Sequence, residues 1–210
     1  MSGAMSKQLP EYNVKRRHIA TDIENIYIKD YDFSSELIHL LETEVVPWGK
    51  TTKNQIWDGG KLNMLTAYTI GWWNPENPKW VNIIDSMVQK FLIDIDPYCK
   101  IESLNRIHAL EFQNDGIMRC HETHQDQYEF DNQWTVLVHV YGTSGDTMFY
   151  KTMNIPEIVK TVPFRQGRML LYPSVYAHKG SMPTDNNKRC IINYLYKLET
   201  KLSDKVKIYK

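Results

Sequence analysis

The run RCIINYLY occupies residues 189–196 and predicts a strand that is buried on both faces. Successive side chains of a strand point to opposite faces, so Arg189 shares one face with Ile191, Asn193 and Leu195. Apart from Arg189 and Asn193 that face is apolar, and the opposite face carries cysteine, isoleucine and tyrosine. Near-continuous hydrophobic strands are typical of sheets covered on both sides.

The guanidinium of Arg189 is costly to bury on such a face unless a carboxylate meets it. Guanidinium and carboxylate groups match each other in a two-pronged geometry. A dicarboxylate ligand would supply that partner. The alternatives are a protein Asp or Glu, or a place at the start of the strand with the head group in water.

Working outward from this run, the second half of the chain predicts a β-rich unit. Its strand-like segments are β-branched or aromatic and are separated by Gly, Pro, Asn and Asp, a pattern typical of a sandwich or barrel. They are 101–112, 134–141, 147–150, 168–172 and 189–196.

The first half reads mainly as helix and loop. Residues 23–29 alternate like a strand, and residues 48–74 read as loop with one or two short strands. One helix is expected after the capping residues Asp32 or Ser34, and a second between Pro78 and Pro97. Helices that precede a β-rich half predict an α+β fold, mainly β, with the helices packed outside a jelly-roll sheet.

Composition favours one soluble globular domain. The chain has 210 residues with 42% hydrophobic and 12% aromatic side chains, enough for a sizeable core. Lys+Arg and Asp+Glu are equal at 25 each, which argues against a broad nucleic-acid-binding surface. We expect a disordered or partly ordered segment at 1–20 and a single domain at 21–210, with helical support at 30–97 and a β core at 100–198.

Localisation follows from what the chain lacks. No apolar run approaches the roughly 20 residues of a membrane-spanning helix, and the N-terminus lacks a signal-peptide core. The three cysteines form no CxxC pair and read as free thiols in a reducing compartment. A cytoplasmic protein without a membrane partner is therefore expected. Nothing in the sequence decides its oligomeric state.

His124, Asp126 and His178 are candidate ligands of one metal ion. Two imidazoles and one carboxylate form the facial triad that leaves positions of an octahedral iron open. Residues two apart in an extended segment point the same way, so His124 and Asp126 can bind one ion together. His121 could compete with His124, but only His124 has an Asp two residues on.

Taken together, short motifs within residues 105–198 resemble the core of the 2-oxoglutarate/Fe(II)-dependent dioxygenases, in the prolyl 4-hydroxylase-like branch. The sequence is similar to small oxygenases of cyanobacterial phages. The resemblance covers a little under half of the chain. The matching pieces are RIHA at 106–109, HQD at 124–126, WTVLVH at 134–139, GDTMF at 145–149, GRMLLYP at 167–173, HKG at 178–180 and RCIIN at 189–193.

The resemblance implies a double-stranded β-helix that uses Fe(II), 2-oxoglutarate and O₂, with ascorbate as an auxiliary reductant. It implies His124, Asp126 and His178 as the iron ligands, with no catalytic residue beyond them. Arg189 would bind the distal carboxylate of 2-oxoglutarate, with Lys188 as its rival at nearly the same spacing. Residues that would line the cosubstrate are Thr135, His139 and Asn193; at His139 the family often has a tyrosine.

The implied reaction hydroxylates an unactivated C–H bond and releases succinate and CO₂. The favoured substrate is a prolyl residue in a peptide, and the alternatives are a nucleobase, a free amino acid or a non-catalytic binding module. Candidate substrate loops are 48–74, 113–123 and 127–133. The first contains Trp48, Trp57, Trp72 and Trp73, which suit a proline-rich peptide or a stacked base. A phage-encoded enzyme would act in the host cytoplasm.

Overall fold

The computed structural model describes residues 20–50, 60–69, 72–114, 123–127, 131–184 and 188–205. The N-terminal segment expected at 1–20 lies almost wholly outside these residues, and the proposed domain boundaries stay predictions. Within the described residues, no helix combines the length and the apolar character needed to cross a membrane.

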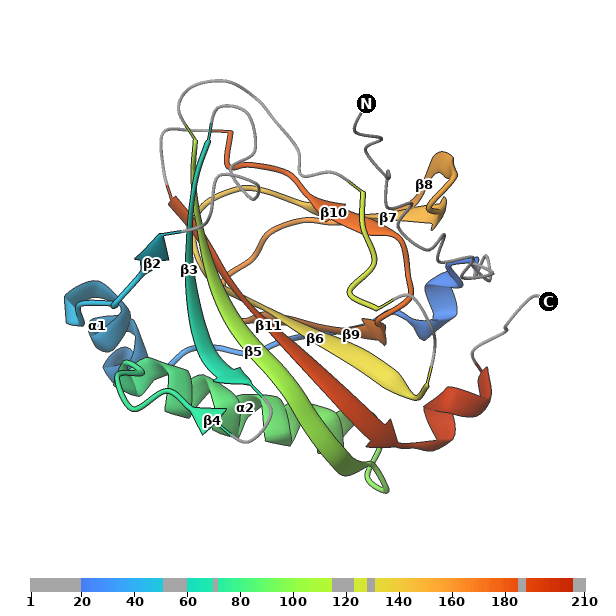
Figure 1. The fold of residues 1–210 in the computed structure, drawn as a ribbon, viewed down its shortest axis with the longest axis horizontal. Helices are drawn as coiled ribbons and strands as arrows, with labels where there is room; N and C mark the ends of the chain where they lie inside the picture. The colour runs from blue at the N-terminus through green and yellow to red at the C-terminus, as the bar shows by residue number, and fades with distance from the viewer. Residues whose placement is uncertain are drawn as a thin grey trace, which may run out of the picture.

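A large antiparallel sheet forms the floor of the molecule (Figure 1). Its strand order is β1-β9-β6-β11-β5-β3-β2, and β4 pairs with β3 at the side. The strands are β1 (Tyr27–Asp30), β2 (Gly49–Lys50), β3 (Gly60–Thr69), β4 (Trp72–Trp73), β5 (Lys100–Asn114), β6 (Gln133–Tyr141), β9 (Arg168–Pro173) and β11 (Lys188–Glu199).

A smaller sheet lies over this floor, in the order β10-β7-β8. It consists of β7 (Thr147–Thr152), β8 (Ile155–Val162) and β10 (His178–Gly180). An isolated antiparallel bridge between His124 and His178 adds the segment 123–127 beside β10. Beyond β5 the chain therefore passes repeatedly between the two sheets, which is a double-stranded β-helix. The predicted fold class is confirmed.

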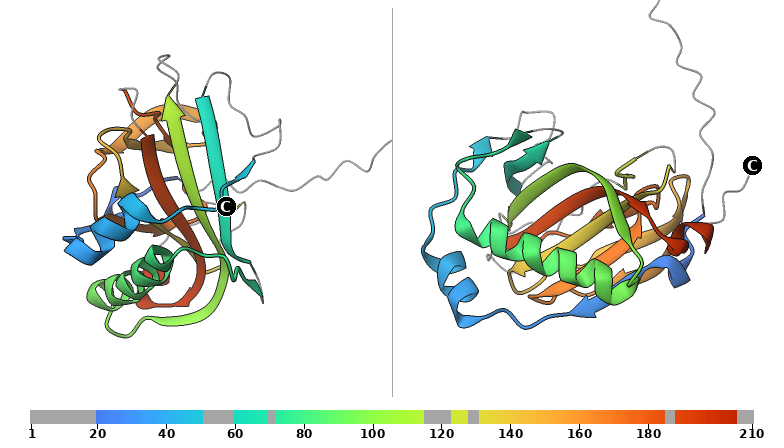
Figure 2. Two further views of the ribbon diagram at one scale, coloured as in Figure 1. Left: turned by 90° about the vertical axis from the view of Figure 1, so that its left-hand side faces the viewer. Right: turned by 90° about the horizontal axis from the view of Figure 1, so that it is seen from below.

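Two helices cover the outer face of the large sheet (Figures 1 and 2). Helix α1 (Ser35–Thr43) begins where the Ser34 side chain accepts a hydrogen bond from the Leu37 N–H, as expected of a cap. Helix α2 (Lys79–Ile95) follows Pro78 and buries an apolar stripe that includes Ile84, Val88 and Phe91. Short 3₁₀ turns, η1 (Ile23–Asn25) and η3 (Lys201–Lys205), flank the sheet ends.

The strand β11 separates two cores, as its alternation predicts. Cys190, Ile192 and Tyr194 pack under the helices in the outer core. Ile191 faces the space between the sheets, in an inner core with Leu137 and Phe149. The inner core is the smaller one because polar groups occupy part of that space.

The structure corrects three local expectations. Residues 23–25 form a 3₁₀ turn instead of a strand, because the Asp22 carboxylate accepts from the Glu24 N–H and closes the turn. Residues 60–69 lie in the segment that was expected to be loop with one or two short strands, and they form the long strand β3 paired with β5. Strand β8 at 155–162 was not expected; its side chains are mostly exposed, so it carries little apolar signal.

Candidate metal centre

The three predicted metal ligands come together between the two sheets. One potential ligand atom from each of His124, Asp126 and His178 lies within 4.8 Å of the others. The backbones of His124 and His178 exchange two hydrogen bonds of 2.9 Å, which fixes the relative positions of the two imidazoles. The Gln125 side chain donates to the Val175 carbonyl and takes no part in the cluster.

A hydrogen bond at its second ring nitrogen fixes the orientation of the His178 imidazole. Its Nδ1 lies 2.9 Å from the carbonyl oxygen of Tyr176, which can only accept, so Nδ1 carries the proton. The lone pair of Nε2 is thereby directed at the cluster, where it lies 3.7 Å from Asp126 Oδ2. Burial lowers the pKa of His178 to about 4, so the ring is neutral near pH 7, as a metal ligand must be.

Polar neighbours hold the Asp126 carboxylate in place. Thr135 Oγ1 donates to Oδ2 at 2.7 Å, and Asn193 Nδ2 and Arg106 Nη2 approach the carboxylate at 3.4 Å. Burial raises the pKa of Asp126, but the histidines when protonated at low pH, the positive charge of Arg106 and the hydrogen bond from Thr135 outweigh it, and the net shift is downward. Asp126 is therefore ionised. The predicted contact of Thr135 and Asn193 with 2-oxoglutarate stays a prediction, while their contact with Asp126 is a feature of the structure.

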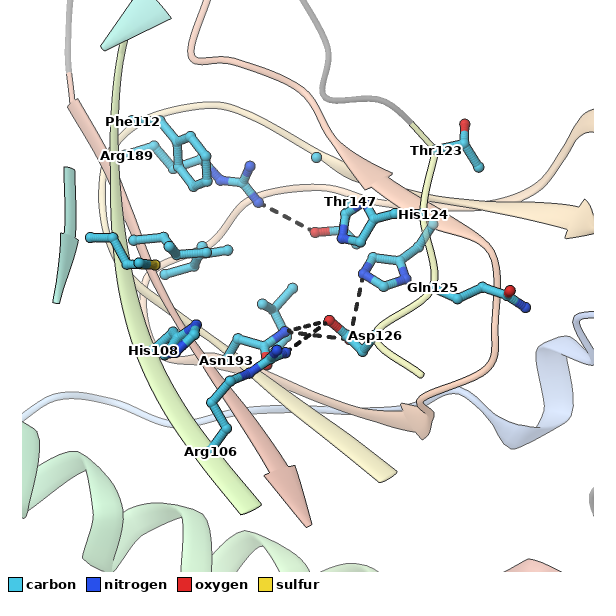
Figure 3. A pocket seen from close by; sticks show the side chains of 16 residues that line it. Arg106, His108, Phe112, Thr123, His124, Gln125, Asp126, Thr147, Arg189 and Asn193 are labelled. Carbon is cyan, nitrogen blue, oxygen red and sulfur yellow. Dashed lines mark hydrogen bonds and ion pairs between the residues drawn. The ribbon is translucent and has the colours of Figure 1, made fainter. Parts of the chain in front are cut away.

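A cavity of about 390 Å³ opens beside the cluster (Figure 3). It extends between the sheets from Asp126 toward Arg189. The described residues that line it are Met64, Arg106, His108, Leu110, Phe112, Thr123, His124, Gln125, Asp126, Leu137, Thr147, His178, Gly180, Arg189, Ile191 and Asn193.

Arg189 closes one end of the cavity and is 1% exposed. Its Nη1 donates to the Ser181 carbonyl at 3.0 Å and its Nη2 to Thr147 Oγ1 at 3.3 Å, both uncharged acceptors. Among the described residues its Nε has no hydrogen-bond partner. The charge of Asp146 acts on the guanidinium, but within the described part of the chain no carboxylate accepts a hydrogen bond from it. Burial lowers the pKa of Arg189 to about 10, which still leaves it charged.

Lys188, the predicted rival of Arg189, points the other way. Its side chain is half exposed, and Nζ lies 3.2 Å from Glu111 Oε1. Lys188 follows the alternation of β11 and belongs to the outer face of the large sheet. Of the two basic residues, Arg189 is the one that the fold brings to the cavity.

His139 lies buried near Arg189, on the inner face of β6. Its Nδ1 accepts a hydrogen bond from the Arg165 backbone N–H at 3.2 Å, so Nε2 carries the proton. Nε2 has no partner among the described residues. Burial, with Arg189 and Arg168, lowers the pKa of His139 to about 3. The ring stacks on Phe164, which also lies under the Arg189 guanidinium.

Several residues of the site were missed in the sequence. Arg106 and His108 were noted only as parts of a motif, although their alternation on β5 signals a shared face. Tyr172 lies at the cluster: its hydroxyl is 3.3 Å from His178 Nε2 and 3.5 Å from Asp126. Phe164 follows no strand pattern and gives no sequence signal.

The predicted substrate loops are only partly described. Trp48 is partly buried against the outer core. Trp72 and Trp73 on β4 are 48% and 39% exposed. Trp57 and His121 lie outside the described residues, as do most of 113–123 and residues 128–130.

No family model and no curated protein matches the sequence, whereas many solved structures match the fold. A 2OG-Fe(II) oxygenase-family oxidoreductase from Burkholderia pseudomallei has a TM-score of 0.57 at 11% identity, over 83% of this chain and 85% of that one. HygX from Streptomyces hygroscopicus, solved with nickel, 2-oxoglutarate and hygromycin B, has a TM-score of 0.53 at 10% identity, over 82% of both chains.

A prolyl hydroxylase from Trichoplax adhaerens, solved in complex with a hypoxia inducible factor peptide fragment, has a TM-score of 0.52 at 16% identity, over 82% of this chain and 83% of that one. The similarity to cyanobacterial phage enzymes stays a prediction. The described chain therefore has the double-stranded β-helix fold of the 2-oxoglutarate/Fe(II) oxygenases.

Proposed function

We propose that this protein is an Fe(II)- and 2-oxoglutarate-dependent dioxygenase that hydroxylates an unactivated C–H bond and releases succinate and CO₂. One observation carries the proposal. A His-Asp-His cluster lines the same cavity as a buried arginine that, among the described residues, donates hydrogen bonds only to uncharged acceptors.

The donor set fits a ferrous ion. Two imidazole nitrogens and one carboxylate oxygen leave open positions on the metal, as in non-haem iron oxygenases. His178 presents an unprotonated Nε2, and Thr135 and Asn193 orient Asp126. When bound, iron would supply the activation of O₂. Around it the protein contributes ligands, orientation and a cavity partly shielded from water.

The opposite end fits the distal carboxylate of 2-oxoglutarate. Among the described residues, the Arg189 guanidinium donates hydrogen bonds only to uncharged acceptors, so a carboxylate bound there would offset the cost of burying its charge. In our proposal the Nε2–H of His139 donates to the same carboxylate, in the place where the family often uses a tyrosine. Ascorbate would serve only to keep the iron reduced.

For the substrate we propose a prolyl residue in an extended peptide. Strand register pairs Thr69 with both Arg106 and Trp72, and directly opposed residues share a face. Trp72 is therefore on the cavity side of the sheet and is half exposed, as an aromatic platform for proline needs. A nucleobase would also stack on Trp72, but the balanced charge of the chain favours a peptide over a polyanion.

We also propose a cytoplasmic location, whether the enzyme is cellular or phage-encoded. Cys99 and Cys190 are free thiols, as expected in a reducing compartment.

Succinate formation tests the proposed function. Purified protein is incubated with Fe(II), ascorbate and 2-oxoglutarate, either alone, with a proline-rich peptide or with an oligonucleotide. We expect succinate to rise with the peptide, and a mass increase of one oxygen in it. Stimulation by the oligonucleotide alone would move the substrate to nucleic acid. A complete lack of succinate in all mixtures would favour a binding module without catalysis.

A further inference from the structure

A second guanidinium faces the cavity at the end opposite Arg189. Arg106 and His108 project from the same face of β5 toward Asp126 and Asn193 (Figure 3). The Arg106 side chain is 32% exposed, whereas Arg189 as a whole residue is 1% exposed. Arg106 therefore sits where the cavity meets solvent and where a substrate would enter.

Asp126 does not satisfy this guanidinium. The Nη2–Oδ1 distance of 3.4 Å is longer than the roughly 2.7–2.9 Å of a strong charge-assisted hydrogen bond. Asp126 already accepts from Thr135 at 2.7 Å. Arg106 Nε is buried and has no partner among the described residues. Donor capacity of Arg106 is thus left over beside the metal cluster.

The expected charges of the site with a metal ion bound also leave Arg106 without a full partner. A bound divalent metal ion would take the Asp126 carboxylate as a ligand, so Arg106 would keep only a share of that partner. Among the described residues that line the cavity, no other carboxylate is available to Arg106. In a cavity partly shielded from water the charge of Arg106 is costly unless an anion approaches it.

We propose that Arg106, with the imidazole of His108 beside it, binds a carboxylate of the substrate. This inference rests on the proposed function and narrows its substrate class. Arg106 Nη2 lies 3.4 Å from Asp126 Oδ1. A carboxylate bound on the other side of the guanidinium would therefore be separated from the metal ligands by that group alone. The carboxylate and the hydroxylated carbon must then belong to the same residue or to adjacent residues. Two sources fit: an acidic residue next to proline in a peptide, or the carboxylate of a free amino acid.

Binding measurements separate these sources without turnover. Protein loaded with Mn(II) and 2-oxoglutarate is titrated calorimetrically with L-proline against L-prolinamide, and with end-blocked Gly-Pro-Glu-Gly against Gly-Pro-Gln-Gly. We expect one carboxylate probe to bind at least about 10-fold more tightly than its amide, since a charge-assisted pair contributes roughly 1.5–3 kcal/mol. Tighter binding of L-proline than of L-prolinamide indicates a free amino acid as the source. Tighter binding of the Glu peptide than of the Gln peptide indicates a peptide.

The ratio of the dissociation constants of the amide and the carboxylate probe in each pair is then measured in variants. Arg106→Gln should reduce this ratio to about one. Arg106→Lys should reduce it to an intermediate value, because lysine keeps the charge but loses the two parallel N–H donors of the guanidinium. The matched control Arg165→Gln, at an exposed arginine paired with Asp30, should keep the wild-type ratio. A ratio compares two probes in one protein, so general damage to the site cancels.

Several results would overturn the inference. They are a wild-type ratio near one in both pairs, an Arg106→Gln protein that keeps the preference, or tighter binding of a nucleoside monophosphate than of either carboxylate. Metal-dependent binding of 2-oxoglutarate is recorded in the same samples. If it is present while the carboxylate preference is absent, the carboxylate assignment fails and the proposed oxygenase function stands.

Discussion

The two arginines of the cavity differ in how the fold encloses them. Arg189 is sealed in, with its guanidinium over the rings of Phe112 and Phe164 and uncharged oxygens at its nitrogens. Arg106 is partly exposed and only loosely paired with Asp126. A closed end suits one invariant ligand, and an open end suits a larger molecule that extends into solvent.

Glycines make the closed end possible. A side chain at Gly145 would place its Cβ 2.6 Å from Arg189 Cδ, and the φ of +108° there also disfavours other residues. At Gly180 the added Cβ would lie 2.8 Å from Arg189 Nη1. Backbone thus packs directly against the guanidinium and leaves it little freedom, which is what recognition of a fixed carboxylate requires.

The proposed metal ligands His124, Asp126 and His178 lie between the two ends of the cavity, and their loss should have the largest effect. Asp126→Ala or His178→Ala should weaken Mn(II) binding more than about 100-fold and remove succinate formation, because two donors cannot hold the ion. His39→Ala, on the exposed side of α1, is the matched control. Substrate-dependent succinate formation by either cluster variant would contradict the ligand assignment.

Arg189→Met should have the next largest effect and should act at the closed end alone. Loss of a buried charged partner costs about 2 kcal/mol or more, so 2-oxoglutarate should bind roughly 30-fold more weakly or worse, with Mn(II) binding retained. Lys188→Met should change neither value, because Lys188 pairs with Glu111 outside the cavity. If Lys188→Met weakened 2-oxoglutarate binding more than Arg189→Met in calorimetry, Lys188 and not Arg189 would be the partner of the distal carboxylate.

Gly180→Ala should give a smaller effect of the same kind. The added methyl group displaces Arg189 Nη1, which costs about 1 kcal/mol and weakens 2-oxoglutarate binding roughly 5-fold. Binding of the carboxylate probes at the Arg106 end should change less. Equal losses at both ends would show that the two ends are not independent.

His139 should produce the smallest effect, seen in the pH dependence of stability. Its pKa is about 3 in the fold and 6.5 as an ordinary side chain, so the unfolded chain binds a proton that the folded chain excludes. The stability it contributes is present above pH 6.5 and is lost as the pH falls from 6.5 toward 3. The free energy of unfolding, measured with denaturant across this pH range, should depend less steeply on pH in His139→Phe than in the wild-type protein. An unchanged slope would mean that His139 is already charged in the fold.

Alternation and spacing predicted the parts of the site that lie on regular strands. Arg189 and Asn193 face inward as period two requires, and His124-Gln-Asp126 presents its outer members to one point. The length of strand β3 was underestimated because Gly60, Asn63 and Thr66 resemble loop composition. Pairing with β5 stabilises this strand, and that contribution cannot be read from the composition of residues 60–69.

Contacts between distant segments could not be predicted. Thr135 holds Asp126, and Phe164 lies between His139 and Arg189, only because the two sheets close over one another. The loose pairing of Arg106 with Asp126 is likewise a property of the tertiary fold. Sequence patterns indicate the face on which a residue lies, whereas packing decides what it meets there.

Calorimetric titration of 2-oxoglutarate tests the central claim most directly. The wild-type protein is titrated with and without Mn(II), beside Asp126→Ala and Arg189→Met. We predict that binding requires the metal and is lost or strongly weakened in both variants, because the ion and the arginine hold the two ends of one ligand. Equal binding with and without metal, or undiminished binding in both variants, would contradict the proposed site.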